Sequence, residues 1–454
     1  MTPRILTRRH RSRGHPAALL AALLTLGACA GRPAAPLAPP SRAAARPSAA
    51  SPPPAISPSA LERLHEEVRV AGLADRRFDH DTYWRAIRPF LGGTVRVLPA
   101  GVSAEGREIF HLTYGSGPVR VLLWSQMHGN ESTASMALAD IVRFFAEHPE
   151  HPLARRIARG ATIHMIPMLN PDGAQRFRRR NAQGVDINRY ARRLQTPEGR
   201  VLKAVRDAVQ PDFGFNLHDQ GTAVRVGDSD RGVAIALLAP AFDSARSVDA
   251  KRRRAMQVAS VIVEAVDPFV GGHVARYDDT FNPRAFGDLI GAWGASTVLI
   301  ESGGWKDDPQ KQYLRMVNFV GILTALDAIA TGRYTSFTPD AYQRLEQNGR
   351  RIPDLLIAGG TLAVPGLPPL QADVLVNYAR PLLREGGTIA DIGDLGGVQA
   401  QDTLRIDGLY LIPMPDALGG DGAIEPGMPA HFVVAEDPAG RRVKLQFRGG
   451  PGTR

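Results

Sequence analysis

Residues that could bind a metal ion or move a proton follow four apolar segments of this 454-residue chain. The segments lead to His128-Gly129-Asn130-Glu131, to a loop over Asn170–Arg189, to His218-Asp219 and to Glu301. If these segments are strands of one open α/β sheet, the four groups can converge, because ligands bind outside the carboxyl ends of such strands. Two imidazoles and one carboxylate, with water in the fourth position, are the ligand set of hydrolytic zinc sites.

His128, Glu131 and His218 are the candidate metal ligands. His128 and Glu131 can reach one ion from a strand end that turns into a helix, and His218 would complete the set. Alternatives remain open, since a chain with 12 histidines can contain H-x-x-E by chance and His218 could be a hydrogen-bonded core residue. Glu301, at the end of a buried segment, is either a functional carboxylate or half of a buried ion pair.

The loop Asn170–Arg189 is rich in arginine. Pro171 has no amide hydrogen and Gly173 tolerates positive φ, so the preceding strand should end at this point. Guanidinium groups match carboxylates bidentately, which suits the loop to an anionic ligand. The alternative is a solvated basic loop.

The elements that would position these residues alternate between strand and helix up to about Gly332. This alternation predicts an α/β fold with a mixed, largely parallel central sheet flanked by helices. The predicted strands are 119–124, 162–168, 213–217 and 297–300. The predicted helices are 132–145, 196–209 with Thr196 as N-cap, 251–266 with residues 251–254 on its solvated face, and a last one from Pro309 to Gly332.

The charge of the chain is concentrated at its N-terminus. Eight arginines and no acidic residue lie in the first 58 positions, which leaves +2 of the formal net charge of +10 for the remainder. A nucleic-acid partner is therefore not implied.

Residues 1–28 have the basic, apolar and small-residue parts of a secretory signal peptide. The sequence Leu26-Gly27-Ala28-Cys29 resembles the lipobox of bacterial lipoproteins, which implies lipidation of Cys29, the one cysteine of the chain. With Ala30 next, this resemblance favours an outer-membrane anchor on the periplasmic side of a Gram-negative envelope. The alternative is a plain signal peptide with an incidental cysteine. Residues 29–60, rich in Ala, Pro and Ser, are predicted to be an extended tether.

From about Thr335 the sequence pattern changes to short β-like runs with many Gly and Pro residues. We expect domain boundaries that give a signal peptide over 1–28, a tether over 29–60, a main domain over 61–334 and a β-rich accessory domain over 335–454. The phrases of the last domain resemble the small β-sandwich of amidohydrolases, without a metal-binding barrel, so nothing catalytic is inferred from them.

Taken in order, S-A-E-G-R-E-I from Ser103, H-G-N-E, N-P-D-G with R-x-N-x-x-G-V-D-I-N-R, N-L-H-D and V-L-I-E-S-G-G resemble the zinc metallocarboxypeptidases of the carboxypeptidase A type. The resemblance covers roughly residues 60–332. It implies one Zn²⁺ held by the three candidate ligands and a peptide substrate with a free C-terminal carboxylate.

The resemblance also implies roles for further residues. Arg179 would polarise the scissile carbonyl, Asn188 and Arg189 would hold the terminal carboxylate, Asp186 would fix the tautomer of His128, and Glu301 would be the general base.

Two positions depart from the family pattern. The family places a covering tyrosine about twenty residues before the catalytic glutamate. Tyr277 is the nearest candidate, but Phe281 lies closer to the expected position. Arg284 could stand at the base of the side-chain pocket and favour an acidic terminal side chain, or it could form a surface ion pair.

The leading hypothesis is a lipid-anchored zinc carboxypeptidase that cleaves a C-terminal peptide or isopeptide bond, with muropeptides as a substrate suggested by location. An N-acyl amino acid deacylase and a catalytically silent zinc-binding lipoprotein are the alternatives.

Overall fold

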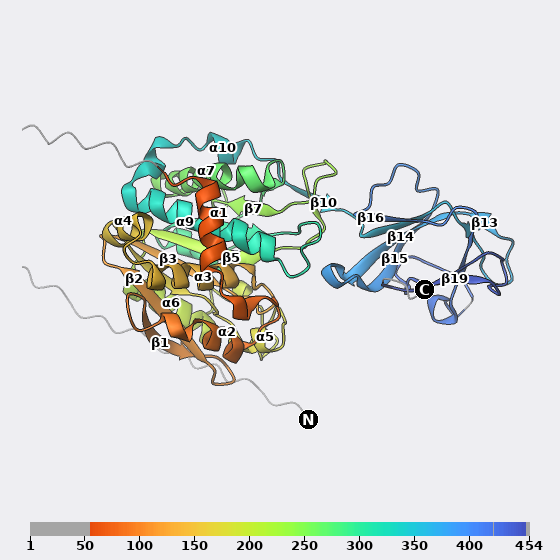
Figure 1. Ribbon diagram of the computed structural model, residues 1–454, viewed down its shortest axis with the longest axis horizontal. Coiled ribbons are helices and arrows are strands. Elements are labelled where there is room, and N and C mark those ends of the chain that lie inside the picture. The colour runs from red at the N-terminus through yellow and green to blue at the C-terminus, as the bar shows by residue number, and fades with distance from the viewer. Residues whose placement is uncertain (1–54, 421, 451–454) are drawn as a thin grey trace, which may run out of the picture. The chain divides into compact units, whose positions relative to one another are not determined.

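The computed structural model describes residues 55–420 and 422–450. Eight of the described strands form one mixed sheet in the order β1-β2-β4-β3-β5-β9-β7-β8 (Figure 1). Strands β4, β3, β5 and β9 run parallel in its centre, whereas β2 and β7 pair antiparallel with β4 and β9. The strands are β1 (Arg96–Val102), β2 (Glu108–Gly115), β3 (Val119–Ser125), β4 (Ala161–Ile166), β5 (Phe213–Asp219), β7 (Ile235–Leu238), β8 (Val274–Arg276) and β9 (Ser296–Ser302).

Helices cover both faces of this sheet. One face packs against α1 (Pro58–Val68), α3 (Thr133–Glu147), α4 (Pro152–Gly160), α7 (Ala250–Val270) and α9 (Gln312–Thr331). The other packs against α6 (Pro197–Val209) and α8 (Phe286–Ala292). The connections contain α2 (His80–Ile87), α5 (Pro171–Gln175) and α10 (Asp340–Gln343), and the 3₁₀ turns η1 (Ala71–Leu73), η2 (Arg88–Phe90), η3 (Ile187–Arg189) and η4 (Arg333–Ser336).

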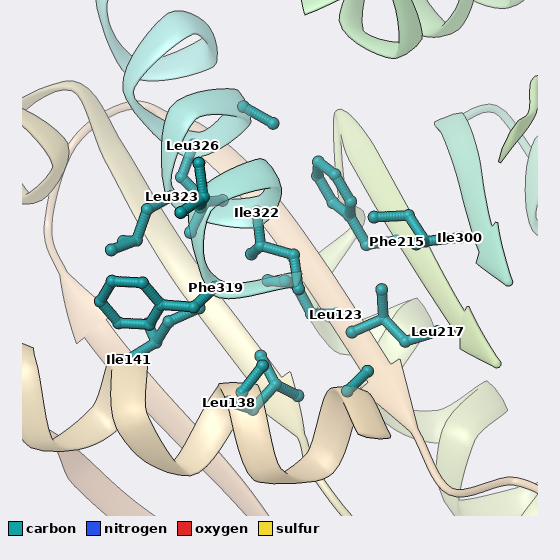
Figure 2. Packing of buried hydrophobic residues seen from close by; sticks show 14 of the residues in the cluster. Leu123, Leu138, Ile141, Phe215, Leu217, Ile300, Phe319, Ile322, Leu323 and Leu326 are labelled. Atoms are coloured by element: carbon teal, nitrogen blue, oxygen red, sulfur yellow. The ribbon is translucent and has the colours of Figure 1, made fainter. Parts of the chain in front are cut away.

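The alternation of side chains along each strand separates two hydrophobic clusters. On β3, Leu123 contributes to the cluster with α3 and α9, whereas Leu122 and Trp124 contribute to the cluster with α6 and α8. Figure 2 shows the first cluster, in which side chains of α9 meet those of α3 and of three central strands. The residues labelled there are Leu123, Leu138, Ile141, Phe215, Leu217, Ile300, Phe319, Ile322, Leu323 and Leu326.

Helix α9 is the most apolar helix of this core. Among the described helices it alone has the length and composition to cross a membrane, but 89% of its most apolar window is buried inside the protein. Its apolar residues are therefore accounted for by packing against the sheet and the neighbouring helices, without any role for lipid.

A buried ion pair joins α3, α9 and the segment after α1. The Asp140 and Arg315 side chains are both fully buried, and two guanidinium nitrogens of Arg315 each lie 2.6 Å from an Asp140 carboxylate oxygen. Arg315 also donates to the carbonyl oxygens of Val70 and Leu73, at 3.0 and 2.8 Å. Asp140 also accepts a hydrogen bond from the Val70 amide and lies 3.1 Å from Nε2 of His65, so removing Arg315 would leave this buried carboxylate without its guanidinium partner but not without contacts.

The predicted α/β architecture is confirmed, and most predicted elements lie within two residues of the observed ones. Thr196 caps α6 as expected, since its hydroxyl accepts a hydrogen bond from the Gly199 amide at 3.2 Å. Gly332 ends α9 in a left-handed conformation with φ of 73°.

Three expectations were wrong in detail. Helix α9 begins at Gln312 instead of Pro309, because Lys311 has φ of 52° and the Asp308 carboxylate accepts hydrogen bonds from the amides of the first turn. Arg252 is not on a solvated face of α7: it is 5% exposed and bonds the Ala239 carbonyl and a carboxylate. Order begins before residue 61, because α1 starts at Pro58 with Ser57 as its N-cap.

The C-terminal strands form two further sheets with a hydrophobic core of their own, as expected for a β-rich region. One sheet has the order β15-β14-β11-β16 and the other β13-β12-β17-β18-β19 (blue in Figure 1). Their bounds are β11 (Leu355–Ala358), β12 (Thr361–Leu362), β13 (Leu370–Gln371), β14 (Asp373–Arg380), β15 (Glu385–Gly393), β16 (Asp402–Arg405), β17 (Tyr410–Pro413), β18 (His431–Ala435) and β19 (Val443–Arg448), with η5 (Pro381–Leu383) and η6 (Pro415–Ala417) between them. Strands β6 (Val224–Val226) and β10 (Asn348–Arg351) pair separately. The boundary at residue 335 stays a prediction.

Candidate metal centre and active site

The four segments that carry the candidate metal-binding and proton-transfer residues lie at one edge of the central sheet. The first two follow β3 and β4, and the other two form the carboxyl ends of β5 and β9; these four strands are neighbours and run parallel. His218 and Glu301 face each other in the register of β5 and β9, so both side chains project from the same face of the sheet. The four segments therefore converge at the strand ends, as expected.

His128, Glu131 and His218 form a buried cluster whose potential ligand atoms all lie within 4.8 Å of one another. Nδ1 of His128 lies 2.8 Å from one carboxylate oxygen of Glu131, and Nδ1 of His218 lies 2.7 Å from the other. Two imidazole nitrogens and a carboxylate thus point at one spot. This donor set fits a zinc ion and leaves room in a tetrahedral site for a fourth ligand.

The electrostatics of the cluster suit a cation. Burial alone would raise the pKa of Glu131, but the two imidazoles beside it hold that pKa well below its ordinary value. Burial lowers the pKa of His218, which favours the neutral imidazole that a metal ion requires. For His128, burial is outweighed by the Glu131 and Asp186 carboxylates, and its pKa is raised.

The backbone around His128 depends on a close approach between two loops. A Cβ atom on Gly129 would collide with the backbone of Gly173 and Ala174 in α5. Asn170 caps α5, because its side chain accepts a hydrogen bond from the Gly173 amide at 2.9 Å. The H-G-N-E and N-P-D-G motifs are therefore parts of one packed unit, which holds His128 against the arginine-rich loop.

Asp186 lies behind His128 in the place expected for it. Its carboxylate is 3.0 Å from Nε2 of His128, the ring nitrogen that faces away from Glu131, and it also accepts a hydrogen bond from the Asn188 amide. Burial alone would raise the pKa of Asp186, but its hydrogen bond with His128 and the neighbouring positive charges lower it well below its ordinary value. A carboxylate here leaves Nδ1 of His128 free for a metal ion.

Arg179 lies next to the cluster. It bonds Glu131 Oε1 at 2.9 Å and Asp186 Oδ2 at 3.0 Å, while 44% of its side chain is exposed. A guanidinium that borders both the ligand carboxylate and solvent can turn toward a bound oxygen atom.

Asn188 and Arg189 belong to η3 and differ in their surroundings. Asn188 is buried: its Oδ1 accepts from the Phe286 amide at 2.9 Å, and its Nδ2 lies 3.5 Å from Nε2 of His218. Arg189 bonds the Asn188 carbonyl oxygen at 3.0 Å and, among the described residues, has no acidic partner within 4.0 Å. Its guanidinium keeps most of its donors for another group.

Glu301 is 7% exposed, and its carboxylate accepts no hydrogen bond from a protein group in the described ranges. Burial, together with the Glu131 and Asp219 carboxylates, raises its pKa well above the ordinary value. Tyr277 lies close enough that the charge of Glu301 is the main cause that raises the tyrosine pKa to about 12. The alternative of a buried Glu301–arginine ion pair is not what the structure contains.

Three charged residues near the cluster had no predicted role. Lys311 is 1% exposed and donates to Asp219 at 3.1 Å, and Arg76 donates to the same carboxylate oxygen at 3.2 Å. The Asp219 amide in turn bonds Glu131 at 3.2 Å. Asp219 was visible in the sequence beside His218, but nothing in the sequence separates Lys311 or Arg76 from solvated residues.

Arg284 is exposed, and its carbonyl oxygen accepts a hydrogen bond from the Ala191 amide at 3.1 Å. It forms no surface ion pair with an acidic side chain in the described part of the chain. Cys29 and the signal segment lie outside the described residues.

Comparison with known proteins finds similarity to carboxypeptidases in this part of the chain. The sequence profile of the zinc carboxypeptidase family matches residues 82–214. Carboxypeptidase D of Anas platyrhynchos is 23% identical over 207 residues, which are 40% of this chain and 15% of that protein. Carboxypeptidase Z of Homo sapiens is 26% identical over 140 residues, 25% of this chain and 22% of that protein. The chain therefore spans less than a quarter of the length of these relatives.

Solved structures give similar matches. A metallo-carboxypeptidase from Pseudomonas aeruginosa aligns with a TM-score of 0.44 at 17% identity, over 57% of this chain and 70% of the other. Bovine thrombin-activatable fibrinolysis inhibitor aligns with a TM-score of 0.44 at 14% identity, over 62% and 98%. The family profile confirms the resemblance that the motifs predicted.

Proposed function

We propose that this chain, whose residues 82–214 belong to a zinc carboxypeptidase domain, is a zinc-dependent metallocarboxypeptidase that removes a C-terminal residue from a peptide. The observation that carries the proposal is the buried cluster of His128, Glu131 and His218 with the unpaired Glu301 beside it. A donor set with an open position, next to a carboxylate of raised pKa, is suited to hydrolysis.

The metal ion in this proposal is Zn²⁺, held by His128, Glu131 and His218. When bound, zinc supplies a Lewis acid that polarises the scissile carbonyl and makes water acidic. Asp186 keeps His128 in the tautomer that presents Nδ1.

Glu301 is the general base in this proposal. It takes a proton from the attacking water and returns it to the leaving amine; burial and the Glu131 and Asp219 carboxylates raise the Glu301 pKa, which makes it a stronger base than an ordinary carboxylate. Arg179 turns from its carboxylate partners to the developing oxyanion and stabilises its charge.

Arg189 sets the exopeptidase register in this proposal, with Asn188 beside it and Tyr277 over the substrate. An arginine without an acidic partner, one residue from a side chain that touches His218, is placed to bind the terminal carboxylate of a substrate. Whether the bond is a peptide or an isopeptide bond, the same carboxylate is required.

The test is the release of the C-terminal residue from paired peptides that end in a free carboxylate or an amide. We expect the free acid to be cleaved, the amide to be cleaved at least about tenfold more slowly, and a chelator to abolish both reactions. Arg189→Ala should reduce the difference in rate between the free acid and the amide. Arg180→Ala is the matched control, because this exposed arginine of the same loop donates to the Gly184 carbonyl.

Equal cleavage of acid and amide by the unaltered protein would contradict the exopeptidase register. Activity confined to N-acyl amino acids would favour a deacylase instead. Zinc binding without any hydrolysis would favour a silent binding protein.

For the location, we propose an outer-membrane lipoprotein on the periplasmic side of the envelope, anchored through lipid on Cys29. The L-G-A-C sequence after a short apolar segment supports this. In that compartment, muropeptides are the peptide substrate we propose.

A further inference from the structure

A hollow of about 610 Å³ beside η3 is lined by four arginines and one tyrosine. The lining residues are Arg189, Tyr190, Arg192, Arg193 and Arg284. The first four lie within residues 189–193, and the hydrogen bond from the Ala191 amide to the Arg284 carbonyl brings the fifth alongside them. The hollow therefore lies between two segments of the main domain.

None of these four arginines has an acidic side chain within 4.0 Å among the described residues, whereas arginines nearby do. Arg176 pairs with Glu105, Arg179 with Glu131 and Asp186, and Arg252 with Asp279. Like charges gathered around one hollow repel one another, and an anion placed among them would remove that cost. The unpaired set thus indicates an anionic ligand.

The hollow borders the candidate active site through Arg189. The residue before it, Asn188, lies 3.5 Å from the metal-ligand candidate His218. The charge of Arg189 also acts on Tyr277, the tyrosine beside Glu301. A substrate whose terminal carboxylate is bound by Arg189 would have its last side chain close to Arg192, Arg193 and Arg284.

Two carboxylates are close enough to Arg189 for its charge to lower their pKa, Asp186 and Asp288, and Asp186 is already engaged by His128 and Arg179. Asp288, at the start of α8, has its pKa raised to about 6 by burial, although Arg189 lowers it in part. It accepts a hydrogen bond from the Asn282 amide at 2.8 Å, forms no ion pair with an arginine of the hollow, and does not line it. The charge that faces the hollow is therefore positive.

We propose that this arginine-lined hollow receives the anionic side chain of a C-terminal glutamate or aspartate, so that the peptide substrates end in a dicarboxylic amino acid. The inference rests on the proposed carboxypeptidase function and specifies its substrate class. The α-carboxylate binds Arg189, and the side-chain carboxylate binds Arg192, Arg193 and Arg284.

The experiment compares peptides that are identical except for a last residue of Glu or Gln, which have the same shape and differ in charge. We expect kcat/KM to be at least about tenfold higher for Glu, because charge-assisted arginine–carboxylate bonds are lost with Gln. Arg284→Gln and the double variant Arg192→Gln/Arg193→Gln should lower this Glu/Gln ratio toward one. These residues are exposed, so the variants are expected to fold.

Arg159→Gln is the matched control. It removes the same charge from an exposed, unpaired arginine just before β4 begins, at the sheet edge opposite the site. Its Glu/Gln ratio should equal that of the unaltered protein. A Glu/Gln ratio near one in the unaltered protein, with chelator-sensitive release of both residues, would overturn the proposed specificity and leave the carboxypeptidase function standing.

A binding measurement gives a readout that does not need turnover. N-acetylglutamate should bind at least about tenfold more tightly than N-acetylglutamine by calorimetry, with and without zinc, and Arg284→Gln should remove most of that difference. If no peptide is hydrolysed but this preference is found, the proposed function fails while the anion site stands. Equal binding of the two ligands would overturn the anion site.

Discussion

Replacing Glu301 by Gln tests the proposed mechanism at one atom. The amide has the shape of the carboxylate but cannot accept a proton. Glu301 is 7% exposed and its carboxylate accepts no hydrogen bond from the described protein groups, so the replacement breaks no side-chain hydrogen bond that holds β9 in place. The Glu301 pKa is raised by burial and, beside it, by repulsion from the Glu131 and Asp219 carboxylates, and the neutral amide removes both effects.

The expected loss of rate follows from the role of Glu301 as general base. Proton transfer by a positioned base contributes about 10²–10⁴-fold to a rate, and Glu301 is the carboxylate beside His218 in the strand register. We expect kcat to fall at least about a thousandfold, which corresponds to about 4 kcal/mol of activation free energy. Zinc content should stay close to that of the unaltered protein, and the melting temperature should not fall, because the neutral amide relieves the cost of a buried carboxylate of raised pKa.

The assay is steady-state release of the C-terminal residue at saturating substrate, with zinc measured on the same samples. Glu66→Gln, an exposed residue of α1 without an ion pair, is the matched control and should keep full activity. Near-native turnover of the Glu301 variant would refute its role as base. Loss of zinc from this variant would instead make Glu301 a ligand.

Three further outcomes follow from the structure and the sequence. Arg315→Met should lower the unfolding free energy by about 3–5 kcal/mol in denaturant titrations, because buried Asp140 loses its guanidinium partner and keeps only His65 and the Val70 amide, and adding Asp140→Leu should restore much of the loss; a change below about 1 kcal/mol would contradict this. Asp288→Asn should stabilise the protein by roughly 1–3 kcal/mol above about pH 6 and leave it unchanged below about pH 4. The stabilisation is expected because the Asp288 pKa of about 6 means that the folded protein binds the carboxyl proton more tightly than the unfolded chain, so the unaltered protein loses stability as pH rises. Equal melting temperatures of the variant and the unaltered protein at pH 8 would exclude this effect. Cys29→Ser should abolish partition into detergent, and unchanged partition would exclude the lipid anchor.

The site residues that could be predicted from the sequence are those that lie at the ends of recognisable strands. His128, His218 and Glu301 each follow an apolar run that could be recognised as a strand, and parallel strands bring their ends together. Asp186 and Arg179 were placed through the motif they share, and the structure brings both to the cluster.

The contacts that could not be predicted are those that join distant segments without a pattern. Lys311, whose own backbone is left-handed, stands just before α9 and donates to Asp219. In the sequence, a basic residue in a loop looks solvated. Arg252 stands among other basic residues at a helix start, yet it is buried because a carbonyl and a carboxylate satisfy it. Tertiary partners, which local composition does not encode, decide both cases.

The central claim is that His128, Glu131 and His218 together hold one zinc ion, and metal content after dialysis tests it most directly. The unaltered protein should retain about one zinc per chain, and His218→Ala should retain far less. His148→Ala is the control, because this residue follows the far end of α3, about 22 Å along the helix from Glu131, and should retain zinc as the unaltered protein does. Equal zinc content in the His218 variant and the unaltered protein would contradict the account.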